Sequence, residues 1–141
     1  MLIHWQSHQD YLFFLHETKV HLDSSQRTRL RLEFGPVCDK LRLLDLDPVI
    51  EYLSAFYPKK GRPAKNQVQI IRSFILMIML GITSLTSWIQ KLIADSLLSM
   101  LIGCTPDSLP PLGSYFDFMD RPLDTVQRFP ENQQEGSFPK G

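Results

Sequence analysis

The alternation of apolar and polar residues is most regular in the middle of the chain, where it predicts two consecutive helices. Residues 66–80 follow the 3.6-residue period of a helix. The first two turns carry one polar stripe, which contains Lys65, Gln69, Arg72 and Ser73. Residues 74–80 are apolar on every side. Because a helix that is apolar all round has to be buried, this segment is expected in the core.

A second, amphipathic helix is predicted after a glycine turn. Gly81 follows the last periodic residue, where a left-handed cap costs glycine little, and Thr83 or Ser84 can cap the next helix. The apolar side of that helix contains Leu85, Trp88, Ile89, Leu92 and Ile93. The opposite side contains Thr86, Ser87, Gln90 and Lys91. Such a pair is typical of a helix-turn-helix, although ordinary all-α domains contain similar pairs with a solvated face.

Two helices are predicted before this pair. Ser24 or Ser25 can cap the first one, and Pro36 should end or kink it because proline lacks an N–H and clashes with the preceding turn. Asp47 followed by Pro48 predicts the start of a second, short helix whose apolar positions reach residue 56.

Two further helices are predicted after it. Asp95 or Ser96 should start a short helix that ends at Gly103, and Ser114 with Asp117 forms a plausible capping box for the last helix. Together the patterns predict an all-α fold, a small multi-helix bundle that contains the helix-turn-helix-like pair.

Length and composition predict one domain with a tail. A chain of 141 residues with 43% hydrophobic residues can bury one sizeable core. We expect residues 1–121 to form that domain, with its most informative part at residues 57–121. From residue 122 onward proline, glutamine, glutamate and glycine dominate, and such a segment buries too little apolar area to order itself. Residues 122–141 are therefore expected to be disordered.

The charge distribution favours an anionic partner for the middle of the chain. The formal net charge is zero, which by itself argues against a nucleic-acid-binding protein. Between Tyr52 and Ala94, however, there is no acid, and the cations there are Lys59, Lys60, Arg62, Lys65, Arg72 and Lys91. A local run of positive charge attracts phosphate, although residues 59–65 can equally be a solvated linker. Arg27, Arg29 and Arg31 alternate around a helix and are expected to form a solvated surface.

Other candidate sites are weaker. His4 and His8 have the i, i+4 spacing of two metal ligands but lack a third ligand in register. Asp45, Asp47 and Glu51 have no histidine in register, so a catalytic acid cluster is not expected. Asp117 and Asp120 form a paired-carboxylate pattern that is better explained by a cap and its solvent-facing neighbour. Cys38 and Cys104 have neither zinc spacing nor a disulfide framework, which favours reduced, buried thiols in a cytoplasmic protein.

Neither a membrane span nor a signal peptide is predicted. The continuous apolar run of residues 74–82 is far shorter than the ~20 residues that a spanning helix requires. The first eight residues lack the basic start and apolar core of a signal peptide.

Several short motifs resemble a known family. They are Gly61-Arg62-Pro63, Ile71-Arg72-Ser73-Phe74, the run from Met79 to Ser84, Gly103, and the run from Gly113 to Arg121. In this order they resemble the N-terminal domain of DDE-type transposases of bacterial insertion sequences, and the similarity covers residues 57–121. In that family the helical domain precedes an RNase-H-like domain whose two aspartates and one glutamate hold divalent metal. The resemblance implies binding of the element's terminal repeats and assembly of the transposase on DNA.

One departure from the family limits what is carried over. After Arg121 the family helix usually continues with an apolar residue, whereas Pro122 stands here and the polar tail follows. No length remains for a nuclease domain, so we expect a truncated or frameshifted transposase fragment that is not an enzyme. No cofactor, metal or small-molecule substrate is expected.

Two functions are consistent with these patterns. In the first, the chain binds DNA through a set of residues that comprises Lys59, Lys60, Arg62, Lys65, Arg72, Ser87, Gln90 and Lys91. The lysines and arginines at positions 59–65 would hold phosphates, with Arg72 at the edge. Ser87, Gln90 and Lys91 would lie near base edges or the backbone of the DNA. In the second, the chain is a protein-interaction module in which the Leu85 and Trp88 face or residues 115–119 form a homo-oligomer or dock on full-length transposase.

Overall fold

The structure, a computed structural model, describes residues 2–3, 5–54 and 64–128, and it confirms the all-α prediction. Within these ranges lie the helices α1 (His8–Val20), α2 (Ser24–Leu43), α3 (Val49–Ser54), α4 (Gln67–Met79), α5 (Leu85–Ala94), α6 (Ser96–Leu101) and α7 (Leu112–Arg128), and the 3₁₀ helix η1 (Pro106–Ser108). Two short strands, β1 (Leu2–Ile3) and β2 (Ala64–Lys65), pair in parallel.

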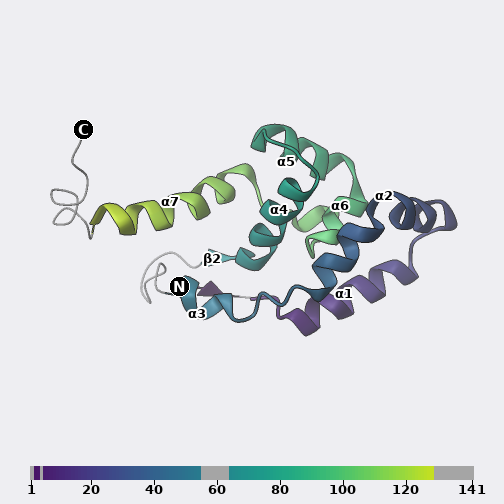
Figure 1. Ribbon diagram of the computed structural model, residues 1–141, viewed down its shortest axis with the longest axis horizontal. Coiled ribbons are helices and arrows are strands. Elements are labelled where there is room, and N and C mark those ends of the chain that lie inside the picture. Colours follow the sequence, from purple (N-terminus) through teal and green to yellow (C-terminus); the bar gives the residue numbers. More distant parts are fainter. Residues whose placement is uncertain (1, 4, 55–63, 129–141) are drawn as a thin grey trace.

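The core is built around the short helix α6. Five of its six residues are buried, and α1, α2, α5 and η1 all pack against it. Figure 1 shows α6 in the middle of the molecule, with the α1–α2 hairpin at one end of the long axis and α7 projecting at the other. As predicted, Asp95 caps α6 by accepting a hydrogen bond from the Leu97 N–H at 3.1 Å. The left-handed φ of +90° at Gly103 follows its end.

The turn between α4 and α5 has the predicted caps, but α4 is less buried than predicted. Gly81 has a left-handed φ of +74°, and the Ser84 hydroxyl accepts a hydrogen bond from the Ser87 N–H at 3.3 Å. Although residues 74–80 are apolar on every side, Ile78 is 71% exposed. The reason is that α4 packs against α2 and α7 and leaves part of its surface uncovered by the described residues.

Helix α2 differs from the prediction at its start and in its middle. Asp23 rather than a serine is the N-cap, and its carboxylate accepts a 2.8 Å hydrogen bond from the Gln26 N–H. Pro36 lies inside the helix instead of ending it. Gly35 precedes this proline, and it lacks the Cβ that would clash with the proline ring in the α conformation. The missing N–H of Pro36 therefore removes one hydrogen bond without breaking the helix.

Helix α7 also continues where the sequence predicted a stop. It begins at Leu112, so Ser114 lies inside the helix rather than at its cap, and it runs through Pro122 to Arg128. The proline nitrogen has no hydrogen atom, so the helix loses the one backbone hydrogen bond that this nitrogen would donate to the preceding turn. The other residues of the helix keep their backbone N–H groups. The helical body therefore extends past residue 121. Residues 129–141, the rest of the predicted tail, lie outside the described residues.

The acid predicted to cap α3 has a different role. The Asp47 carboxylate accepts hydrogen bonds from the His8 N–H at 2.9 Å and from Trp5 Nε1 at 3.2 Å. It thus holds the first turn of α1, which Ser7 caps. Helix α3 is described from Val49 to Ser54, and its predicted end at residue 56 lies outside the described residues.

Candidate nucleic-acid interface

One side of α5 is exposed and polar, as its periodicity predicts. Ser87, Gln90 and Lys91 are exposed and share one face of the helix at i, i+3 and i+4, while Trp88 and Leu92 are buried on the other. Ile93 was expected on the buried side but is 67% exposed. Five residues after Trp88 correspond to a rotation that leaves it about 140° away from the indole, outside the packed face.

A hydrogen-bond node orients this face outward. Trp88 Nε1 donates to Ser73 Oγ at 2.8 Å, and the Tyr115 hydroxyl donates to the same oxygen at 2.9 Å. All three side chains are buried, so these bonds satisfy groups that would otherwise lose their hydration. Ser73 therefore joins α4, α5 and α7 at one point. The sequence placed Ser73 only in a polar stripe, because its partners lie 15 and 42 positions away.

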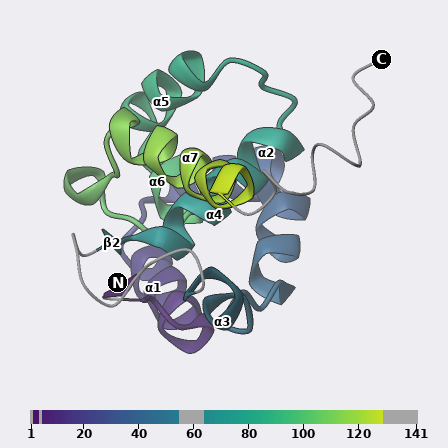
Figure 2. The same cartoon turned by 90° about the vertical axis from the view of Figure 1, so that its left-hand side faces the viewer.

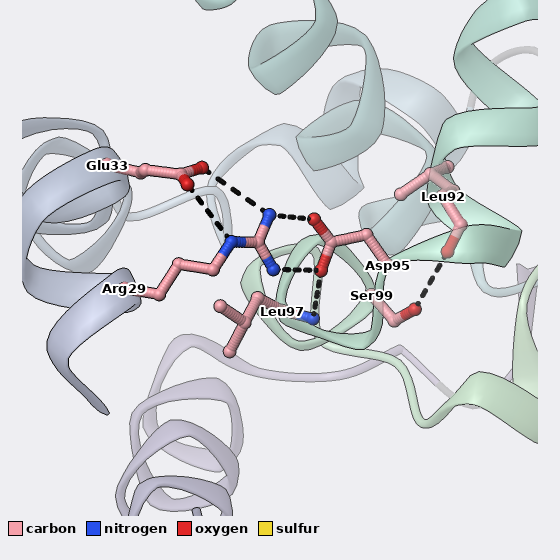
Figure 3. A network of polar contacts seen from close by, with 6 residues as sticks. All are labelled: Arg29, Glu33, Leu92, Asp95, Leu97 and Ser99. Carbon is pink, nitrogen blue, oxygen red and sulfur yellow. Dashed lines mark hydrogen bonds and ion pairs between the residues drawn. The ribbon is translucent and has the colours of Figure 1, made fainter. Parts of the chain in front are cut away.

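The other end of α5 is held by an ion pair from α2. Figure 3 shows the Arg29 guanidinium between Glu33 and Asp95, with Arg29 Nη1 3.0 Å from Asp95 Oδ1 and Arg29 Nε 3.1 Å from Glu33 Oε1. These bonds lower the pKa of Asp95 below its usual value, mainly through the hydrogen bonds from Arg29. Arg29 lies at the surface as predicted, with its side chain 41% exposed, but its ion pair with Asp95 was not predicted because the partner lies 66 positions away.

Arg72 is not at the edge of the candidate interface. It is 1% exposed, and its guanidinium carbon lies 3.6 Å from the centroid of the Tyr11 ring. Its Nη1 donates to Gln6 Oε1, whereas Nε and Nη2 have no hydrogen-bond partner among the described residues. Burial lowers the pKa of Arg72 to about 10. The expectation that Arg72 contacts DNA is therefore corrected: this side chain is part of the core.

Of the remaining predicted cations, Lys65 alone lies within the described residues, and its backbone is not beside the α5 face. Lys59, Lys60 and Arg62 lie outside the described residues. The backbone of Lys65 is in β2, which precedes α4, whereas α5 follows the other end of α4 (Figure 1). A helix of 13 residues is about 20 Å long. Ser87, Gln90 and Lys91 are thus brought together, and Lys65 lies near the opposite end of α4.

Other predicted sites have structural roles or lie partly outside the described residues. His4, the partner proposed for His8, is outside them. Among the described residues no three His, Cys, Asp or Glu side chains are placed to share a metal ion. Cys38 and Cys104 are buried free thiols, and burial raises both pKa values, that of Cys104 to about 11. No helix in the described ranges is both long and apolar enough to cross a membrane.

Comparison with known families decides the identity. A family model described as Transposase domain (DUF772) matches residues 27–119, about two thirds of the chain. The chain belongs to this transposase-domain family. The match extends the resemblance seen at residues 57–121 toward the N-terminus, so α2 and α3 are part of the transposase domain as well. No curated protein and no solved structure matches the chain.

Within the transposase domain, sequence reasoning missed the groups that fix α5. The node at Ser73 and the Arg29–Asp95 pair connect the two ends of α5 to α4, α7 and α2. Neither has a spacing signal, since the partners come from distant elements. The exposed face of α5 is the part of the candidate interface that periodicity alone predicts correctly.

Proposed function

We propose that this transposase domain binds DNA through the exposed face of α5 and contributes no strand-cleaving chemistry of its own. The observation that carries the proposal is the family match over residues 27–119. The residues assigned to DNA are Ser87, Gln90 and Lys91 on α5, with Lys59, Lys60, Arg62 and Lys65 as additional phosphate contacts. Arg72 is left out because it is buried.

The chemistry of the α5 face supports this assignment. A serine hydroxyl and a glutamine amide can each donate and accept hydrogen bonds, and a lysine ammonium provides a point charge for phosphate. Lys91 forms no ion pair with another described residue, so its charge is available to a ligand. Gln90 can pair with the donor and acceptor edge of adenine in the major groove, provided the helix enters it.

The separation between α5 and the backbone of Lys65 also fits a duplex. Lys65 precedes α4 and Ser84 follows it, so about 20 Å of helix lies between them. At 3.4 Å per base pair, this corresponds to roughly six base pairs of duplex. We propose that the α5 face and Lys65 contact phosphates on the same duplex about half a helical turn apart.

The proposal is tested by fluorescence anisotropy with two labelled duplexes at several salt concentrations. One duplex carries the terminal repeats of the element that encodes the chain, and the other is a shuffled sequence of the same length. Lys91→Gln is expected to reduce the magnitude of the salt slope by about one, because one phosphate contact is lost. Gln90→Ala is expected to reduce the preference for the terminal repeats with little change in that slope.

A matched control separates specific contacts from net charge. Lys40→Gln removes an exposed cation from α2, outside the α5 face, and should leave both affinities unchanged. Binding of the parent chain no tighter than that of an acidic control protein would reject the assignment to DNA. Incubation of the duplex with the chain and Mg²⁺ should leave the strands intact, and a product that increases with chain concentration would overturn the non-catalytic part of the proposal.

A further inference from the structure

A groove between α1 and α2 combines an apolar floor with a cationic rim. It encloses a cavity of about 540 Å³, within the size range of sites that bury large ligands or protein side chains. Leu30 and Cys38 are buried beneath it. The cationic side chains that line it are Lys19 from α1 and Arg27 and Arg31 from α2, and His16 from α1 lines it as well. Arg27 and Arg31 are one turn apart and share a face of α2. From the sequence, Arg27, Arg29 and Arg31 were expected to be spread around the helix.

The charge of this groove is not neutralised by the described residues. Asp39 also lines the cavity, but its carboxylate lies 3.6 Å from Arg42 in the next turn of α2. Arg27 donates a 2.9 Å hydrogen bond to the carbonyl oxygen of Val20, which leaves its charge uncompensated. Lys19 and Arg31 form no ion pair in the described part of the chain. The groove is therefore suited to a ligand that has both carboxylates and apolar side chains.

Nucleic acid fits this groove less well than an acidic helix. Binding sites for unpaired bases combine cations with large aromatic side chains on which bases stack, and among the described residues no Phe, Tyr or Trp lines this cavity. A duplex would use the cationic rim but would leave the apolar floor without a partner. A helix laid in a groove uses both, since its apolar face fills the floor and its charged residues meet the rim.

Helix α7 of the same chain has the complementary chemistry. Phe116 is 46% exposed and Met119 41% exposed, and Asp117 and Asp120 beside them are exposed as well. Phe116, Met119 and Asp120 share one side of the helix at i, i+3 and i+4. The other side is attached to α4, where the Tyr115 and Phe74 rings lie 5.5 Å apart between centroids. The exposed side is thus acidic and apolar and has no partner among the described residues.

The arrangement in space makes a second copy the partner for this helix. Figure 1 shows α7 projecting at one end of the long axis and the α1–α2 hairpin at the other, and Figure 2 shows α7 nearly end-on in front of α4. A chain in this conformation cannot place α7 in its own groove. Two chains side by side with opposite directions would bring each α7 to the groove of the other, which is a closed two-fold arrangement.

We propose that two copies of this chain associate by reciprocal docking of the exposed side of α7 into the cationic α1–α2 groove. Phe116 and Met119 fill the apolar floor, and Asp117 and Asp120 pair with Arg27, Arg31 and Lys19 at the rim. Such an interface places its charges at the border and its apolar side chains in the centre. The association uses surfaces that are separate from the α5 face, so it does not depend on the proposed DNA contacts.

The proposal is tested with charge-reversed variants of the full chain, whose dimer Kd is measured by sedimentation equilibrium. The groove variant Arg27→Glu/Arg31→Glu and the helix variant Asp117→Lys/Asp120→Lys should each raise the dimer Kd at least tenfold. An equimolar mixture of the two variants should restore a heterodimer with nearly the parental Kd, because each α7 then meets a groove of opposite charge. Raising the salt concentration should weaken the parental dimer, since rim charges are screened.

Lys40→Glu makes the same kind of charge change on α2 outside the groove and should leave the Kd unchanged, and thermal melts show whether each variant folds. A monomeric parent, or two folded variants whose mixture does not associate, would overturn the proposal. Loss of duplex affinity in the groove variant without a change in self-association would assign the groove to DNA instead. Intact self-association without any duplex binding would reject only the DNA proposal.

Discussion

Gln6 Nε2 donates a 3.2 Å hydrogen bond to the carbonyl oxygen of Gly103, although the two residues are 97 positions apart. The oxygen of the same amide accepts from Arg72, so one side chain joins the N-terminal segment, the end of α6 and the middle of α4. Tyr11 supports the same region, because its hydroxyl donates a 2.6 Å hydrogen bond to the carbonyl oxygen of Leu101. The buried guanidinium is therefore held by a ring face and an amide rather than by a carboxylate.

Gly103→Ala should destabilise this junction strongly. A Cβ at this position would overlap Gln6 Oε1 and lie 3.1 Å from Arg72 Nη1, and the φ of +90° is unfavourable for alanine. Backbone strain and the clash together should lower the free energy of unfolding by about 2–4 kcal/mol, measured by urea denaturation. Gly81→Ala is the control, since its φ is +74° but no atom lies within 4 Å of its Cβ. That variant should lose only about 1 kcal/mol, and equal losses at both glycines would contradict the role given to Gln6.

Ser73→Ala should weaken the attachment of α5 and α7 to α4. It removes the oxygen that accepts hydrogen bonds from Trp88 and Tyr115, and it leaves both buried donors without an acceptor. The expected loss is about 1–3 kcal/mol in the free energy of unfolding, with greater exposure of Trp88 visible in its fluorescence. Ser25→Ala, at an exposed position in the first turn of α2, is the matched control. A Ser73 variant as stable as this control would show that the node does not hold the helices together.

Arg29→Gln should lower stability at neutral pH and reduce its dependence on acid. The bonds from Arg29 lower the pKa of Asp95 below its ordinary value of 3.8 in the folded state. A carboxyl with a lowered folded pKa stabilises the protein above its unfolded pKa, and this contribution is lost as the pH falls below about 4. The variant should therefore lose about 1 kcal/mol at pH 7 and show a smaller further loss in acid.

Urea denaturation between pH 7 and pH 2 measures this difference, and Arg42→Gln serves as its control. Arg42 pairs with the exposed carboxylate of Asp39 at 3.6 Å, a solvated ion pair of the kind that contributes little, so its removal should change stability little at any pH in that range. Parallel stability curves for the parent and the Arg29 variant would exclude a linkage between Asp95 and this arginine.

Arg72→Met should leave DNA binding unchanged, in contrast to Lys91→Gln. The Arg72 guanidinium is buried, and its removal loses the hydrogen bond to Gln6 Oε1 and the contact with the Tyr11 ring. We expect a loss of about 1–3 kcal/mol in the free energy of unfolding and the same salt slope in fluorescence anisotropy as the parent. A salt slope whose magnitude is smaller by about one would show that Arg72 contacts a phosphate, which requires the side chain to leave the core on binding.

The sequence by itself determined the helical class, the starts of α5 and α6, and the polar side of α5. Those features depend on neighbours within about four positions: Ser84 and Asp95 accept bonds from the next turn, Gly81 permits a left-handed cap, and Trp88 and Leu92 repeat with the helical period. The same local rules failed at Pro36 and Pro122. At both prolines, the free-energy cost of one missing hydrogen bond was smaller than the stabilisation from the helical turns on either side.

Tertiary structure alone decided which polar groups are buried and which apolar groups stay exposed. Arg72 was expected beside DNA but is packed on Tyr11, and the half-buried Asp95 pairs with the surface residue Arg29, because each partner comes from a distant element. Ile78 and Ile93 stay exposed because no described helix covers their side. A periodic pattern predicts that a helix has an apolar face, but the packing of neighbouring helices decides how much of that face is covered.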